Sequence, residues 1–219
     1  MRIKFGHKSY LGEPRFTLNM IVLENGVLNL KTRDFLPYSP DYFVISKLLF
    51  SYDKSANCPH FLNFLDQFCL QKEDRKELIR SWFYALVHQL LDLQIFMCII
   101  CPGGSGKSTM ALVATALVGH EATITTTLKS LRSDTFETIN LRGKKLIMIS
   151  NFEQYVGDLS IFKQIVGGDA LKGRVKHVQG SFEVPPEGMV VLVGNKPLQS
   201  RDSSNAIRKG ALKYKLGQE

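Results

Sequence analysis

The sequence predicts an α/β fold, in which a parallel sheet is covered by helices, from three observations. From about residue 95 onward, apolar runs of strand length alternate with helix-like segments. The runs "QIFMCII", "KKLIMIS" and "GMVVLVGN" are continuously apolar, as strands buried on both faces are. A glycine-rich stretch, "CPGGSGKST" at residues 101–109, stands between the first of these runs and a helix-like segment. Strands and helices that alternate in this way form a parallel sheet with helices on both faces.

The chain before residue 94 is expected to form a small, mainly helical domain. Residues 18–30 resemble a β-hairpin, with Asn25-Gly26 as its turn. Residues 60–70 and 72–91 are helical in pattern, and an apolar stripe runs along the second helix at Leu78, Trp82, Leu86 and Leu90. At this spacing Trp82 is expected in the core rather than stacked on a base. We therefore predict an N-terminal hairpin and helical domain over 1–93 and a second domain over 94–219.

In the second domain each element follows from a local pattern. Strands are predicted at 94–100, 122–128, 144–150 and 188–195, and helices at 107–118 and 158–168. Gly119 and the pair Gly167-Gly168 are expected to end the two helices.

Composition is that of an ordinary globular protein. The 219 residues are 44% hydrophobic and 22% charged. The longest apolar run is too short to span a membrane, and the N-terminus has no apolar segment of signal-peptide length. We expect an intracellular protein that is neither secreted nor membrane-bound. Cys98 and Cys101 form a C-x-x-C without a second pair, so all four cysteines are expected to be reduced thiols rather than zinc ligands.

The glycine-rich loop fits a phosphate-binding P-loop. Its backbone N–H groups would surround phosphates, Lys107 would reach the β- and γ-phosphates of ATP, and Ser108 would bind Mg²⁺. The residues expected to bind the nucleotide are Pro102, Gly103, Gly104, Ser105, Gly106, Lys107, Ser108 and Thr109. Cys101 replaces the first glycine of the motif, which would cost about 1–3 kcal/mol if its backbone dihedrals were unusual.

The acids that a P-loop needs are expected at the end of the strand beside the loop. "KKLIMISNFE" offers Asn151 and Glu153, which would face the same way if the extended backbone continued. Glu153 would serve the Mg²⁺ or the attacking water, whereas Asn151 adds no charge for a hard cation. Two alternatives follow: a slowed or inactive ATPase, or an ATPase for which Glu153 suffices.

Charge is concentrated towards the C-terminus. The chain carries a net charge of +8, and residues 171–219 hold nine Lys or Arg against four Asp or Glu. A basic segment of this kind is typical of nucleic-acid binding, and a solvated basic tail is the alternative.

Together these motifs resemble the helicase part of phage, plasmid and poxvirus-type primase–helicases, a branch of superfamily 3 within the AAA+ class. The resemblance covers roughly residues 20–210 and includes "CPHFLNFLDQF", "PGGSGKST", "LRGKKLIMIS", "FKQIVGGDALKG" and "VLVGNKP" in that order. It implies a ring, a homo-hexamer or a mixed ring, that moves single-stranded DNA with ATP and Mg²⁺. Nothing in the chain resembles the primase domain of longer relatives, so a primase is a further expected partner.

The resemblance also implies roles for residues beyond the loop. Asn195 would sense the γ-phosphate, and "GRVKHV" would be a pore hairpin whose Arg174, Lys176 and His177 contact DNA. A half-buried strand histidine is an equal alternative for His177. Arg208, with Arg201 second, would reach the nucleotide of the neighbouring subunit.

Three departures from the family remain: Cys101, Asn151 and a C-terminal end shorter than usual. They suggest a shortened copy of a replication helicase, as in plasmids, phages and organellar genomes, located in a bacterial or host cytoplasm or an organelle such as a plastid. The hypotheses are an ATP-dependent DNA helicase, an accessory subunit that binds ATP and DNA without turnover, and an unstable relic. A kinase is not expected, because no substrate-binding constellation is found.

Overall fold

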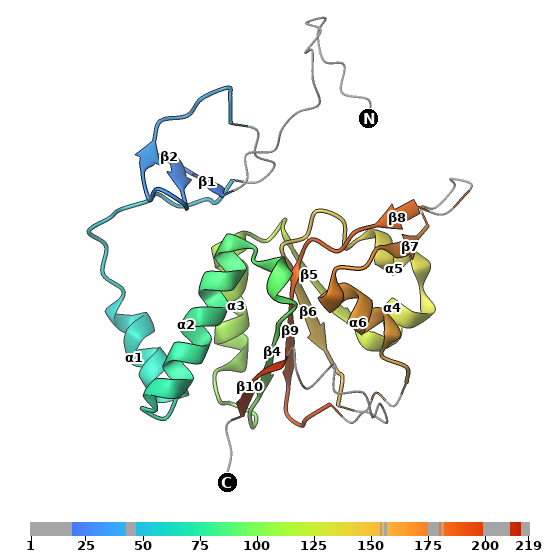
Figure 1. Cartoon of the computed structure of the whole chain (residues 1–219). Coiled ribbons are helices and arrows are strands. Elements are labelled where there is room, and N and C mark those ends of the chain that lie inside the picture. Colours follow the sequence, from blue (N-terminus) through green and yellow to red (C-terminus); the bar gives the residue numbers. More distant parts are fainter. Residues whose placement is uncertain are drawn as a thin grey trace, which may run out of the picture. The chain divides into compact units, whose positions relative to one another are not determined.

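The computed structural model describes residues 19–42, 47–153, 155, 157–174, 180, 182–198 and 211–215. The chain divides into two compact units, Met1–Lys54 and Ser55–Glu219 (Figure 1). In the part of the chain that the structure describes, no helix has the length and apolar character needed to cross a bilayer.

The first unit contains the predicted hairpin. Strand β1 (Met20–Leu23) pairs antiparallel with β2 (Gly26–Asn29), which also pairs with the short β3 (Phe35–Leu36). The register pairs Leu23 with Gly26, so the turn residues are Glu24 and Asn25, one position earlier than predicted. The reason lies in tertiary contacts: the Asn25 side chain exchanges two hydrogen bonds, of 2.9 and 2.8 Å, with the backbone of Tyr52.

The second unit is built on a five-stranded parallel sheet, which confirms the predicted α/β class (Figure 1). The strand order is β10-β4-β9-β6-β5. The strands are β4 (Phe96–Ile100), β5 (Thr123–Thr127), β6 (Leu146–Ser150), β9 (Met189–Gly194) and β10 (Ala211–Lys215). A separate antiparallel pair, β7 (Leu171–Gly173) and β8 (Phe182–Val184), precedes β9.

Helices cover both faces of the sheet. The core on one face includes residues of α1 (Pro59–Phe68), α2 (Glu73–His88) and α3 (Lys107–Val118). The other core includes residues of α4 (Leu128–Ser133) and α6 (Ser160–Gly167). Successive residues of β4 alternate between the two cores, as expected for a strand covered on both faces. The short helices η1 (Leu91–Leu93) and α5 (Thr135–Ile139) complete the second unit.

The division between units falls at residue 54/55, whereas the boundary predicted at residue 93/94 lies inside the second unit. Helices α1 and α2 share their core with the sheet: the fully buried Trp82 and Leu86 belong to one cluster with Met97 of β4 and Met110 of α3. Trp82 is thus a core residue, as predicted. Leu90 is 36% exposed, because α2 ends at His88, before the last position of the predicted stripe.

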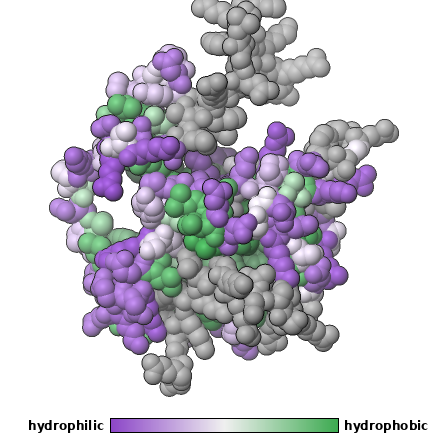
Figure 2. Space-filling model, in the orientation of Figure 1, coloured by the Kyte–Doolittle hydropathy of each residue, from purple (hydrophilic) through white to green (hydrophobic). Residues whose placement is uncertain are grey.

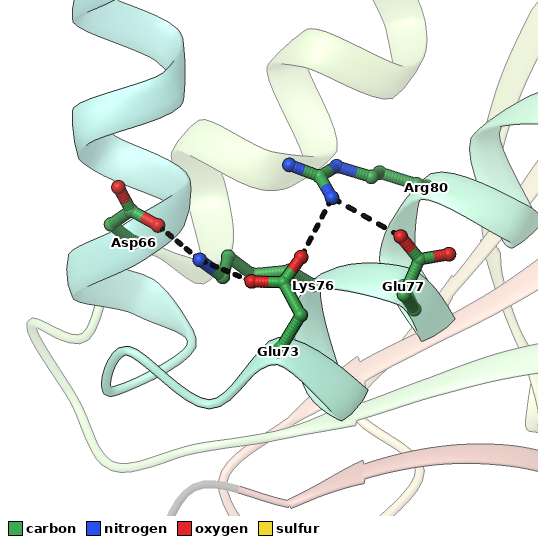
Figure 3. Close-up of polar contacts among 5 residues, drawn as sticks. All are labelled: Asp66, Glu73, Lys76, Glu77 and Arg80. Atoms are coloured by element: carbon green, nitrogen blue, oxygen red, sulfur yellow. Dashed lines mark hydrogen bonds and ion pairs between the residues drawn. The ribbon is translucent and has the colours of Figure 1, made fainter.

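Charged side chains join α1 to the start of α2. Lys76 bridges Asp66 of α1 at 2.7 Å and Glu73 at 2.6 Å, while Arg80 bridges Glu73 at 2.9 Å and Glu77 at 3.2 Å (Figure 3). The surface over these helices is correspondingly hydrophilic (Figure 2). The hydrogen bond from Lys76 lowers the pKa of Glu73, and the hydrogen bond to Asp66 raises the pKa of Lys76.

This ion-pair network predicts a pH-dependent contribution to stability. Glu73 has a pKa below its ordinary 4.5, so it stabilises the fold above that pH and loses this contribution as the pH falls through the lowered value. Lys76 stabilises below its ordinary 10.5 and loses its contribution at higher pH, above the raised value. We expect Lys76→Met to lower the melting temperature slightly near pH 7, and the difference from the native chain to shrink in acid. Melting curves from pH 7 to pH 3 measure this, with the exposed Lys129→Met as charge-matched control.

Candidate nucleotide site

The loop between β4 and α3 has the backbone geometry of a phosphate cradle. Gly104 and Gly106 have φ values of +75° and +91°, a region that favours glycine. An added Cβ at Gly103 or Gly104 would meet no atom of the described part of the chain within 4 Å, apart from the adjoining residues, so the loop is open there. Cys101 does not have a positive φ, and its side chain is buried in the core. The strain considered for a cysteine at this position is therefore absent, because the chain leaves the strand without a left-handed residue there.

The N-terminus of α3 is arranged to receive an anion. Gly106 is its N-cap, and no side chain among the described residues caps the first amides of the helix. Ser108 and Thr109 are exposed in the first turn. The hydroxyl oxygen of Ser105 is buried and has no hydrogen-bond partner among the described residues. Uncapped amides, open glycines and an unpartnered hydroxyl fit a phosphate group better than a purely structural turn.

Lys107 is held inside the loop. Its Nζ donates hydrogen bonds of 2.6 Å to the carbonyl oxygens of Cys101 and of Pro102. The ammonium group therefore lies over the start of the loop, on the side from which the chain leaves β4. A bound phosphate would offer it a stronger, charge-assisted partner than these neutral carbonyls.

Glu153 follows β6, and its carboxylate lies beside the end of β9. Its Oε1 accepts a hydrogen bond of 2.7 Å from the backbone N–H of Asn195. A Cβ on Gly194 would come within 2.7 Å of the same oxygen, so only glycine leaves room for the carboxylate there. Sequence reasoning missed Gly194, although a glycine at a strand end beside a polar residue signals a close approach.

Asn151 and Glu153 do not continue the strand as predicted. Asn151 has φ of +52° and is exposed, which breaks the extended backbone after β6. The next residue, Phe152, is completely buried in the core under the sheet. Burial of this ring turns the chain, and asparagine is one of the few residues that accept the left-handed conformation this requires. The sequence-based prediction that the two side chains face the same way assumes an extended backbone. The backbone is not extended at Asn151, so the prediction no longer follows.

The sequence predicts the acid-bearing strand, β6, directly beside β4, the strand that leads into the loop. In the structure another strand lies between them. β9 lies between β4 and β6, so the neighbour of β4 on this side is followed by Asn195 and not by the acid-bearing segment, and the neighbour on the other side is β10. The apolar residues of β9 are buried on both faces, which suits a central strand. Because parallel strands end at the same edge, the loop, Asn195 and Glu153 still gather at one edge of the sheet. The N–H of Cys101 donates to the carbonyl of Gly194 at 3.2 Å and joins the loop to this edge.

A metal held by the protein alone is not indicated. Among the described residues, no three His, Cys, Asp or Glu side chains gather as ligands would. The residues expected to bind Mg²⁺, Ser108 and Glu153, would supply two oxygen ligands. This suits Mg²⁺, which usually takes one or two protein ligands together with phosphate oxygens and water.

The segment expected to contact DNA, residues 173–178, begins at the last residue of β7 and lies between β6 and β9 in the chain. β7 and β8 pair antiparallel, with Lys172 opposite Glu183. Arg174 follows β7 and is exposed. Lys176 and His177 lie outside the described residues, as do Arg201 and Arg208.

Two family models match the chain. A family of unknown function, DUF5906, matches residues 99–209, which include the loop, β6 and β9. A D5 N-terminal-like family matches residues 14–70, which include the hairpin and α1.

Curated relatives come from the liverwort Marchantia polymorpha. "Uncharacterized mitochondrial protein ymf21" is 34% identical over 138 residues, which cover 58% of this chain and 77% of the relative. "Uncharacterized mitochondrial protein ymf20" is 36% identical over 62 residues, which cover 28% of this chain and 37% of the relative.

Solved structures of the NrS-1 C-terminal region share the fold. An A-form apo structure has a TM-score of 0.52 at 15% identity and covers 64% of this chain and 33% of that one. A second apo structure, of residues 305–718, has a TM-score of 0.51 at 12% identity and covers 85% and 56%. The chain thus spans between a third and just over half of these structures. The chain belongs to DUF5906, a family of unknown function, whose model matches half of it. Its D5 N-terminal-like segment, together with the fold shared with the NrS-1 C-terminal region, supports a relation to the phage-type primase–helicases.

Proposed function

We propose that this chain binds ATP and Mg²⁺ at the loop after β4 and acts as an ATP-dependent DNA helicase of the superfamily-3, AAA+ type. The observation that carries the proposal is the convergence of three chain segments at one edge of the parallel sheet. Lys107 follows β4, Asn195 follows β9 and Glu153 follows β6, and the Asn195–Glu153 hydrogen bond ties the last two together. A loop lysine, a polar strand end and a carboxylate in this arrangement suit phosphoryl transfer to water.

Each group has a task in that chemistry. The amides at the start of α3 would hold phosphate oxygens, and Lys107 would exchange its two carbonyl partners for the β- and γ-phosphates. Ser108 and Glu153 would hold Mg²⁺, which neutralises developing charge on the phosphates when bound. Glu153 would also orient the attacking water, and Asn195 would contact the γ-phosphate.

The basic C-terminal third supports single-stranded DNA as the partner. Arg174 is exposed after β7, on the hairpin that the family resemblance assigns to the pore. Contacts from Arg174, Lys176 and His177 to phosphates would be independent of sequence and weakened by salt. A ring of identical subunits, or a mixed ring with a longer relative, would bring Arg208 or Arg201 to the neighbouring nucleotide. A primase would act beside it.

The proposal is tested by steady-state ATP hydrolysis with and without single-stranded DNA. We expect turnover that requires Mg²⁺, rises when DNA is added and loses this stimulation at high salt. A rate of ATP hydrolysis that does not change when DNA is added would contradict a DNA helicase. The chain would then be an ATPase of another kind.

A second function is favoured by Asn151: a subunit that binds ATP and DNA but hydrolyses ATP poorly. Asn151 is exposed at the end of β6 and offers Mg²⁺ no negative charge.

The variant Asn151→Asp separates the two functions. Aspartate also accepts the left-handed backbone at this position, so the fold should persist while a charge is added. We expect turnover to rise by about tenfold, a gain of about 1.4 kcal/mol in transition-state stabilisation. Turnover by Asn151→Asp with none by the native chain would favour the accessory subunit. Asn151→Gly, which also accepts the left-handed backbone and adds no charge, is the control.

The compartment is proposed from the relatives. Two of them are named as mitochondrial proteins, which supports an organelle interior, and among organelles the mitochondrion rather than the plastid.

A further inference from the structure

An aromatic cluster on α1 packs against the phosphate loop. A Cβ at Gly106 would lie 2.9 Å from Cε2 and 3.3 Å from Cζ of Phe64, and 3.5 Å from Cδ2 of Phe68. Gly106 is the N-cap of α3, so the contact falls on the residue at which the cradle passes into the helix. Glycine is therefore needed at this position for two reasons: its positive φ and the close approach of the Phe64 ring.

The cluster continues into α2. Phe64 lies 5.7 Å from Phe68 and 6.4 Å from Phe61, measured between ring centroids. Phe61 lies 6.4 Å from Phe83 of α2, which in turn lies 5.4 Å from Trp82, the protein's single tryptophan. Phe64 is half-buried and packs against the core cluster that contains the buried Phe68 and Trp82.

The loop needs such support because its other glycines have none. Nothing lies within 4 Å of a Cβ position at Gly103 or Gly104. A backbone rich in glycine has wide conformational freedom, and freedom lost on binding reduces affinity. Among the loop glycines, Gly106 is therefore the one whose position is set by a side chain from another element.

We propose that Phe64 is a positioning residue for nucleotide binding, whose ring fixes Gly106 and thereby the first amides of α3. The proposal rests on the proposed function, since it concerns the same nucleotide site. Helix α1 lies in the residues that match the D5 N-terminal-like family, and the loop lies in the residues that match DUF5906. The proposal therefore assigns α1 a role in nucleotide binding. Helix α1 is then part of the nucleotide site.

The test compares three variants: Phe64→Ala, Phe64→Leu and the matched control Phe61→Ala. Phe61 lies on the same helix and in the same cluster, but the atoms nearest to Gly106 belong to Phe64 and Phe68. ATP affinity is measured by titration calorimetry with Mg²⁺, and the melting temperature is measured without nucleotide. We expect Phe64→Ala to weaken ATP binding by about tenfold and Phe64→Leu by less, since a displaced loop loses pre-organised contacts. Phe61→Ala should lower the melting temperature comparably and leave the affinity within about twofold.

Trp82 gives a second readout of the same contact. Because it packs in the aromatic row that ends at Gly106, ATP should change its fluorescence in the native chain, and Phe64→Ala should reduce that change. A purely structural role for Phe64 would leave the fluorescence response intact.

The ATP affinities of the native chain and the variants distinguish failure of this proposal from failure of the proposed function. If the native chain binds ATP and Phe64→Ala binds it equally, the role of Phe64 is overturned and the nucleotide site stands. If Phe61→Ala weakens binding as much as Phe64→Ala, general loosening of the helices explains the effect, and the proposal is again overturned. If the native chain binds no ATP, both are overturned. If Phe64→Ala does not fold, the ATP affinities of Phe64→Leu and Phe61→Leu are compared instead, with the same two outcomes.

Discussion

Lys107→Ala is expected to abolish ATP hydrolysis, with a loss of at least about a hundredfold. The ammonium group of Lys107 is the cation of the loop itself, and its hydrogen bonds to Cys101 and Pro102 hold it beside the cradle. Removing it leaves the glycine backbone intact but takes away the charge that would stabilise the β- and γ-phosphates of ATP. Binding of ATP, measured by calorimetry, should weaken as well.

The appropriate control for this variant is Lys129→Ala, which removes the same charge from an exposed position on α4. The melting temperature of Lys107→Ala should stay close to that of the native chain, because the lost hydrogen bonds go to loop carbonyls rather than into the core. Unchanged hydrolysis in Lys107→Ala would show that the activity comes from another site or from a contaminant.

The elements predicted correctly from the sequence are those set by local patterns. The hairpin at β1–β2, the strands β4, β5, β6 and β9, and the helices α1, α2, α3 and α6 all follow from apolar periodicity and from glycines at their ends. β10 was missed, although the alternation in "ALKYK" is typical of a strand. The helices α4 and α5 were missed too, since with six and five residues they are too short to show a helical period.

The site was harder to predict, because its geometry depends on contacts between distant residues. The motif identified Lys107 and Glu153, but no local pattern shows that β9 inserts between β4 and β6. The left-handed turn at Asn151 depends on burial of Phe152 in a core formed by other elements. The contact joins Phe64, in the middle of α1, to Gly106, the N-cap of α3, and nothing in the sequence near either residue signals it.

Glu153→Gln is expected to remove hydrolysis while ATP binding persists. Glutamine has nearly the same shape, and its side-chain oxygen can still accept the N–H of Asn195, so the contact of 2.7 Å is kept while the negative charge is lost. A neutral amide cannot act as a base for water and binds Mg²⁺ less well than a carboxylate. We therefore expect turnover to fall by about a hundredfold or more, with affinity for ATP changed much less.

A second substitution at this position separates charge from structure. Glu153→Ala removes both the charge and the acceptor for Asn195, whereas Glu153→Gln removes the charge alone. If hydrolysis falls equally in both variants, the carboxylate acts through its charge on Mg²⁺ or water. If Glu153→Gln keeps the native rate and Glu153→Ala does not, Glu153 serves only to hold the end of β9, and another group must orient the water. Where the native chain itself turns over slowly, the same pair is compared in the Asn151→Asp background, because the added charge there does not touch the hydrogen bond from Asn195.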